Sequence, residues 1–339
     1  MSSSEETPNT EHDLGHVLRN AGRRSDPPED LQQAVRAAVE AEWRGVVVAG
    51  HARRRRIGFA VAATITLAAV ALWSARPLLL QSPGQKMAAV SFTVGSVRAK
   101  AGWLDSWQPV SAHETLRVGE TLATSPDGRA ALSLDDNLSI RLDHDTRIAF
   151  VDPQRISIES GAVYVDSGRG AQPPSDERLQ IVTPVGAVRH VGTQYEARIV
   201  GTDVRIAVRE GKIELNTRAG TMQRVAAGEQ MIISSAGSVV RSSVPSYGAL
   251  WRWVSATAPS FDIEGHSLAE FLSWAARELG RDVVFDSTET QAEASRVQLS
   301  GSIAGLSPDD ALSAVLPTTP LRSEVRNGQL LVSFSSATR

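Results

Sequence analysis

The residue types that most often carry out chemistry are few and scattered in this sequence. It has no cysteine, which excludes disulfides, thiolate metal sites and cysteine nucleophiles. Its seven histidines include no pair at the spacing of a helical metal-ligand motif such as H-E-x-x-H. His144 lies between Asp143 and Asp145, but a solvated turn explains this group better than a metal site. We therefore predict no enzyme active site, no cofactor and no metal site.

Composition and charge exclude some other classes of protein. The 339 residues carry 35 Lys and Arg against 38 Asp and Glu, a net charge of -3. A dedicated nucleic-acid binder normally shows a clustered basic excess, so we expect no direct nucleic-acid partner. With 42% hydrophobic and 22% charged residues the chain is globular, and its length suggests two or more folded units.

One apolar segment, residues 57–76, has the length of a membrane-spanning helix. It is free of charge up to its last residue, and about 20 apolar residues suffice to cross a bilayer. Four consecutive arginines precede it: Arg53, Arg54, Arg55 and Arg56. The positive-inside rule then places residues 1–56 in the cytoplasm and the rest beyond the membrane. A buried helix and a cleaved signal peptide are the alternatives, although a signal peptide begins at the N-terminus.

The segment before the membrane contains one amphipathic helix, predicted over residues 26–47. Asp26 suits its N-cap, and Glu29 completes a capping box. Its apolar side chains recur every four residues and form one stripe: Leu31, Val35, Val39 and Trp43. A lone helix cannot bury such a stripe, so we interpret it as a face for a cytoplasmic partner. The alternative is a solvated extension of the membrane helix.

Beyond the membrane, residues 89–240 predict a mainly β domain, an antiparallel sandwich or roll. Apolar and polar residues alternate, with Arg141 between Ile140 and Leu142, and with Arg209 expected to point outward. Turn signals separate these short stretches. Residues 241–260 read as a linker. Its two tryptophans, Trp251 and Trp253, either pack as part of a capping segment or anchor the linker on a neighbouring domain.

The last region, residues 261–335, predicts a small α+β domain with the order βαβ-βαββ. Helices are expected after the N-caps Ser267 and Ser307, and a turn at Asn327-Gly328 joins a closing hairpin. The predicted strands include residues 261–263 and 296–300. Such an order describes a two-layer domain with its own core.

The sequence resembles the FecR family in a series of short motifs. These are GAVYVD at 161–166, TPVGAVRHVGTQYEAR at 183–198, VREGKIEL at 208–215 and AGEQ at 227–230. The stretch 261–334 is similar to the STN-like domains of secretins and TonB-dependent receptors. The chain is thus identified as a FecR-type protein with a C-terminal STN-like domain.

This resemblance implies a role. FecR-type proteins are single-pass proteins of the bacterial inner membrane, with a periplasmic receiver and a cytoplasmic part that binds an extracytoplasmic-function (ECF) sigma factor. Their signal comes from a TonB-dependent outer-membrane receptor, often one for iron chelates. The alternative is a membrane-anchored periplasmic binding or scaffold protein without a sigma-factor partner, which the short segment 1–56 favours.

The resemblance also singles out the bond between Gly192 and Thr193. It matches the Gly-Thr step at which some FecR-type regulators cleave themselves. The Thr193 hydroxyl is a nucleophile next to the Gly192 carbonyl, and His190 is a candidate base. The alternative is that Gly192 supplies an unusual backbone angle or close packing and that no bond breaks.

Overall fold

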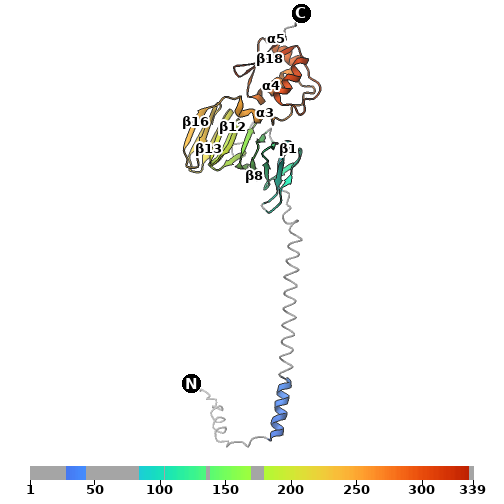
Figure 1. The fold of residues 1–339 in the computed structure, drawn as a ribbon, viewed down its shortest axis with the longest axis vertical. Coiled ribbons are helices and arrows are strands. Elements are labelled where there is room, and N and C mark those ends of the chain that lie inside the picture. Colours follow the sequence, from blue (N-terminus) through green and yellow to red (C-terminus); the bar gives the residue numbers. More distant parts are fainter. Residues whose placement is uncertain (1–27, 43–83, 103, 135–137, 169–178, 336–339) are drawn as a thin grey trace, which may run out of the picture. The chain divides into compact units, whose positions relative to one another are not determined.

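The computed structural model describes residues 28–42, 84–102, 104–134, 138–168 and 179–335. The chain divides into two units, residues 1–82 and 83–339, which are described separately. In the first unit, residues 29–42 form a helix within the predicted span 26–47, and every residue from 28 to 42 is exposed (Figure 1). No helix in the described ranges has the length and apolarity to cross a membrane. The predicted span 57–76 lies outside the described residues.

The second unit begins with a 16-stranded sheet (Figure 1). Its strands are β1 (Lys86–Val94), β2 (Val97–Lys100), β3 (Gln108–Pro109), β4 (Thr115–Arg117), β5 (Thr121–Thr124), β6 (Arg129–Ser133), β7 (Ser139–Leu142), β8 (Arg147–Asp152), β9 (Arg155–Ser160), β10 (Ala162–Asp166), β11 (Gln180–Thr183), β12 (Gly186–Val200), β13 (Asp203–Thr217), β14 (Met222–Ala226), β15 (Glu229–Ile233) and β16 (Val239–Ser243). The fold is therefore mainly β, as the alternating pattern predicts.

The long hairpin of β12 and β13 joins two arms of this sheet. The arm β3-β2-β5-β8-β9-β11 ends on the first part of β12, and the arm β4-β1-β6-β7-β10 ends on its second part. Likewise β13 pairs with β15 through its first part and with β14 through its second. The pairing is antiparallel except between β9 and β11, which are parallel. The sheet is thus a large curled one, and it differs from the antiparallel sandwich or roll predicted by its one parallel pair.

Side chains from both arms form one apolar core because alternate residues of each strand point to the same face. Leu122 and Ile148 of one arm and Ile140 and Val163 of the other belong to this core, and none is exposed. The opposite face of β7, β10, β12 and β13 carries polar residues between these positions. Other parts of the chain contact this second face through Arg141.

The connecting stretch 241–260 covers part of this second face. It contains η1 (Ala249–Trp251) and the short helix α3 (Arg252–Ser255). Trp251 and Trp253 pack on Tyr164 of β10, and the Trp251 indole donates a hydrogen bond to the Pro245 carbonyl. Of the two roles considered for these tryptophans, the structure shows anchoring on the β domain.

The C-terminal module has its own core and a three-stranded sheet of order β17-β19-β18. Its elements are α4 (Leu268–Leu279), β17 (Asp282–Phe285), α5 (Thr288–Arg296), α6 (Pro308–Val315), η2 (Leu316–Thr318), β18 (Leu321–Arg326) and β19 (Gln329–Phe334). Ser267 and Glu270 form the capping box of α4, and Gly280 ends it in the left-handed conformation.

Two strands predicted for this module are corrected. Residues 261–263 form no strand; Ile263 packs into the core without joining a ladder. At 296–300 there is only an isolated bridge from Gln298 to Ser267, preceded by helix α5. The sequence of α5 is strongly polar and buries only Thr290 and Ala294, so it lacks the apolar period from which a helix is predicted.

Candidate functional site

Gly192 and Thr193 lie in a β-bulge in the middle of β12. The register with β13 jumps from Val191 opposite Lys212 to Gln194 opposite Glu210. The two residues between them therefore lie opposite the single β13 residue Gly211. At this point β12 changes partner from β11 to β10. A bulge inserts residues that the ladder does not pair and bends the strand there. The Gly192-Thr193 bond is therefore at the bend of the long hairpin.

The backbone of the bulge adopts conformations that favour glycine. Gly192 has φ +60° and Gly211 has φ +77°, both in the left-handed region. A Cβ on Gly192 would meet no atom within 4 Å. A Cβ on Gly211 would lie 2.3 Å from the Gly192 carbonyl oxygen. The unusual backbone angle is thus found at both glycines, whereas close packing requires glycine at Gly211.

Thr193 is buried, and its hydroxyl has no hydrogen-bond partner in the described structure. Its backbone is held by Ser167, the residue after β10. The Thr193 N–H donates to the Ser167 hydroxyl at 2.8 Å, and the Thr193 carbonyl accepts from the Ser167 N–H at 3.1 Å. A buried hydroxyl usually has a partner, so an orphan next to a bulge is a candidate nucleophile.

Polar and charged side chains connect the bulge to helix α4. Gln194 donates from Nε2 to Asp166 Oδ2 at 2.8 Å. Arg277 of α4 donates to Asp166 Oδ1 and to Glu210 Oε2, each at 2.5 Å. Burial alone would lower the pKa of Arg277, but the charges of Asp166 and Glu210 raise it above the ordinary arginine value. The guanidinium therefore remains charged at any physiological pH.

Most of the hairpin that forms this bend lies within a stretch that matches a known family model. Residues 120–214 match FecR, described as FecR protein, and they include the bulge. The chain therefore contains a FecR domain. The predicted resemblance is confirmed for this stretch.

Other comparisons add little to the FecR match. Two crystal structures of a "putative anti-sigma factor" from Parabacteroides distasonis are similar at 14% identity, covering 64% of this chain and 99% of theirs, with a TM-score of 0.34. A TM-score of this size supports no argument about fold or function. No curated protein matches the chain.

A second group of charged residues joins the FecR domain to α4. Arg141 of β7 pairs with Glu278 at 2.7 Å and donates to the Val254 carbonyl at 2.8 Å. Its guanidinium also lies 5.3 Å from the centre of the Tyr164 ring. Arg209 donates to the carbonyls of Ser246 and Glu278. The outer face of the FecR domain is thus an interface, held by polar bonds to the C-terminal module.

The other predicted sites are placed as follows. Leu31, Val35 and Val39 are 56%, 58% and 60% exposed, so their stripe has no cover among the described residues. Trp43 and the cluster Arg53, Arg54, Arg55 and Arg56 lie outside the described residues, as does the side chain of His190.

Next to His144, Asp143 is not solvated as the sequence suggests. It is buried and bonded to Arg129 and Arg198.

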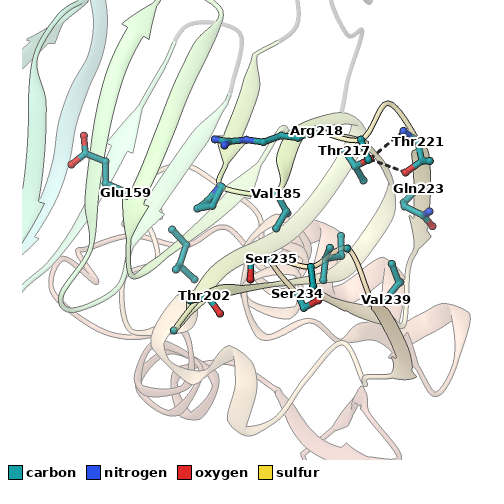
Figure 2. Close-up of a pocket in the computed structure, with 17 residues that line it drawn as sticks. Glu159, Val185, Thr202, Thr217, Arg218, Thr221, Gln223, Ser234, Ser235 and Val239 are labelled. Carbon is teal, nitrogen blue, oxygen red and sulfur yellow. Dashed lines mark hydrogen bonds between the residues drawn. The ribbon is translucent and has the colours of Figure 1, made fainter.

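A hollow of about 790 Å³ lies between turns at one end of the large sheet (Figure 2). Short hydroxyl side chains line much of it, and Thr217 and Thr221 are bonded to each other. Glu159 is the one carboxylate among its lining residues and Arg218 the one guanidinium. Within the described ranges, no three His, Asp or Glu side chains are grouped to hold a metal ion.

Sequence reasoning missed Arg277, Asp166 and Ser167 as parts of the bulge environment. Asp166 ends the motif GAVYVD, and Arg277 lies on a helix surface more than a hundred residues later. Asp166 and Arg277 stand out in the sequence only as charged residues at positions that the strand and helix periods direct away from the local apolar cores. Which part of the chain covers such a face is decided by the tertiary structure.

Proposed function

We propose that this chain is a FecR-type regulator that crosses the bacterial inner membrane once. In this proposal the FecR domain and the STN-like C-terminal module are periplasmic, and the helix of residues 29–42 is cytoplasmic. A periplasmic signal from a TonB-dependent receptor changes how the chain holds an ECF sigma factor. The FecR match and the sequence of residues 53–76 support this proposal.

The observation that carries the proposal is the attachment of α4 to the FecR domain. A receiver module must transmit the event of binding to the rest of the chain. Arg141–Glu278 and Arg277–Asp166 are direct ion pairs between α4 and the strands of the FecR domain. A partner that displaced α4 would have to break them, so binding energy at the module is coupled to the FecR domain.

The two ends of the chain offer surfaces for the proposed partners. Leu31, Val35 and Val39 form an exposed apolar stripe suited to a helix-in-groove contact with a sigma factor. On the C-terminal module, β18 is at the edge of its sheet, and Val325 on it is 50% exposed. An edge strand can accept a strand from a receptor by β-addition.

Self-cleavage between Gly192 and Thr193 is part of the proposal. The Thr193 Oγ bonds to the Gly192 carbonyl carbon and gives its proton to solvent water, and the bond between that carbon and the Thr193 nitrogen breaks. The freed nitrogen takes a proton from the Ser167 hydroxyl 2.8 Å away, which regains one from solvent. Water then hydrolyses the ester, leaving a Gly192 carboxylate and a new N-terminal Thr193. The bulge and the unpartnered hydroxyl support this step.

Sigma-factor binding is tested by co-purification with the full chain in bacteria. The variant Leu31→Ala with Trp43→Ala should lose an ECF sigma factor that the wild type retains, while both remain in the membrane fraction. Arg36→Ala, on the polar side of the same helix, is the matched control. Recovery of no sigma factor by the wild type supports the scaffold alternative. Protease added to spheroplasts should digest residues 84–339 and spare residues 1–56.

Cleavage is tested by intact-mass measurement of the full chain after purification. A fragment that begins at Thr193 is expected from the wild type and from Thr193→Ser, which keeps a hydroxyl. Thr193→Val, which has nearly the same shape, should remain intact. If the wild type also remains intact under all conditions, Gly192 has only a structural role.

A further inference from the structure

We propose that Arg277 is the positioning residue for the Gly192-Thr193 bond, so that the C-terminal module controls the geometry of the bulge. This inference rests on the proposed cleavage for its functional meaning. In the structure this is a clamp, in which one guanidinium on α4 holds residues of β12 and β13 beside the bulge. The clamp consists of Arg277, Asp166, Gln194 and Glu210.

The first arm of the clamp reaches β12. Arg277 Nη2 donates to Asp166 Oδ1 at 2.5 Å, and Asp166 Oδ2 accepts from Gln194 Nε2 at 2.8 Å. Gln194 is the residue directly after Thr193. Asp166 is also followed by Ser167, whose hydroxyl accepts from the Thr193 N–H. The Asp166 carboxylate thus fixes the Gln194 side chain, which directly follows Thr193. It also fixes the end of β10, where Ser167 holds the Thr193 nitrogen.

The second arm reaches β13. Arg277 Nη1 donates to Glu210 Oε2 at 2.5 Å, and Glu210 is the register partner of Gln194. The next residue, Gly211, packs against the Gly192 carbonyl. The position of Glu210 therefore sets how closely β13 approaches the carbonyl that is to be attacked. Arg277 therefore contacts residues next to both members of the reacting pair.

The chemistry of arginine suits this task. Its planar guanidinium donates in two fixed directions, so it can hold two carboxylates at a set angle, whereas the point charge of lysine cannot. The Arg277 side chain is 16% exposed and that of Asp166 is 9% exposed, so solvent screens their ion pair little. Movement of α4 would release both strands together. The bulge would then relax, and the hydroxyl would lose its alignment with the carbonyl.

The test combines hydrogen exchange and cleavage in the full chain, purified in detergent. Arg277→Ala should speed amide exchange in peptides that cover the bulge by about tenfold or more and slow cleavage by a similar factor. Exchange in β15 should stay unchanged. Asp166→Asn should give the same local effect, and the double variant should add little to it, because both act through one contact. Arg224→Ala, which removes an exposed pair with Glu214, is the matched control.

Each outcome decides the proposal. Local loss of protection with slower cleavage supports it. Wild-type exchange at the bulge in Arg277→Ala overturns it, as does loss of protection spread evenly over the whole sheet. If Arg277→Ala does not fold, Arg277→Lys takes its place and should loosen the bulge alone. If the wild type shows no cleavage, the cleavage step is lost, while the exchange measurement still decides whether Arg277 holds the bulge.

Discussion

Arg141 and Glu278, which lie 137 residues apart in the sequence, form a buried ion pair. Their closest nitrogen and oxygen atoms are 2.7 Å apart, and the two side chains are 1% and 8% exposed. Burial alone would lower the pKa of Arg141, but the charge of Glu278 outweighs it and raises that pKa above its ordinary value. The pair is where the second face of the FecR domain and the last turn of α4 meet.

Removing one partner of this pair should be costly. Glu278→Ala leaves the Arg141 charge buried without a carboxylate, and the free energy of unfolding should fall by about 3–5 kcal/mol. Replacing both residues by methionine should cost clearly less than the sum of the single changes. Denaturant unfolding measures both. Glu159→Ala, from an exposed pair with Arg147, should cost at most about 1 kcal/mol. Equal costs for Glu278→Ala and Glu159→Ala would contradict the buried pair.

Stability should fall in acid because of Asp143. Burial alone would raise its pKa, but hydrogen bonds from Arg198 and Arg129 bring it below the ordinary value. The unfolded chain therefore binds this proton first as the pH falls through about 4, which favours unfolding. Unfolding curves between about pH 7 and pH 3 should show a shallower loss of stability for Asp143→Asn than for the wild type. Parallel losses in the two proteins would assign the acid sensitivity to other groups.

Two glycines at the bulge should respond differently to alanine. Gly192→Ala places a side chain in open space and should cost about 1–2 kcal/mol, the strain of the left-handed conformation. Gly211→Ala carries the same strain and also forces the Gly192 carbonyl away, which adds about 1–3 kcal/mol. Thermal unfolding should rank Gly211→Ala as the less stable variant. The reverse order would show that β13 does not approach the bulge this closely.

Trp251 should be needed to keep the connecting stretch on the FecR domain. It is 1% exposed, packs on Tyr164 and donates to the Pro245 carbonyl at 2.8 Å. Trp251→Ala should lower the free energy of unfolding by about 3–5 kcal/mol, and limited proteolysis should then cut within residues 241–260. Trp251→Phe keeps much of the packing and should cost less. Resistance to protease equal to the wild type would place the anchor elsewhere.

Several elements could be predicted from local chemistry because their signals are local. Ser267 caps the start of α4 as expected, since an N-cap depends on a few neighbouring residues. The Asn327-Gly328 turn joins β18 and β19 for the same reason. Helix α5 was not predicted, because it buries too few apolar residues to show a period.

The sequence by itself determined which face of each strand meets the apolar core, because side-chain direction alternates with a period of two. It placed Arg141 and Arg209 on the opposite face, and they are there. Only the tertiary structure decided that this face is covered, since α4 and the two tryptophans reach it from distant parts of the chain. The Gly192-Thr193 step is likewise visible in the sequence, but its bend, its orphan hydroxyl and its link to Arg277 depend on which strands lie beside it.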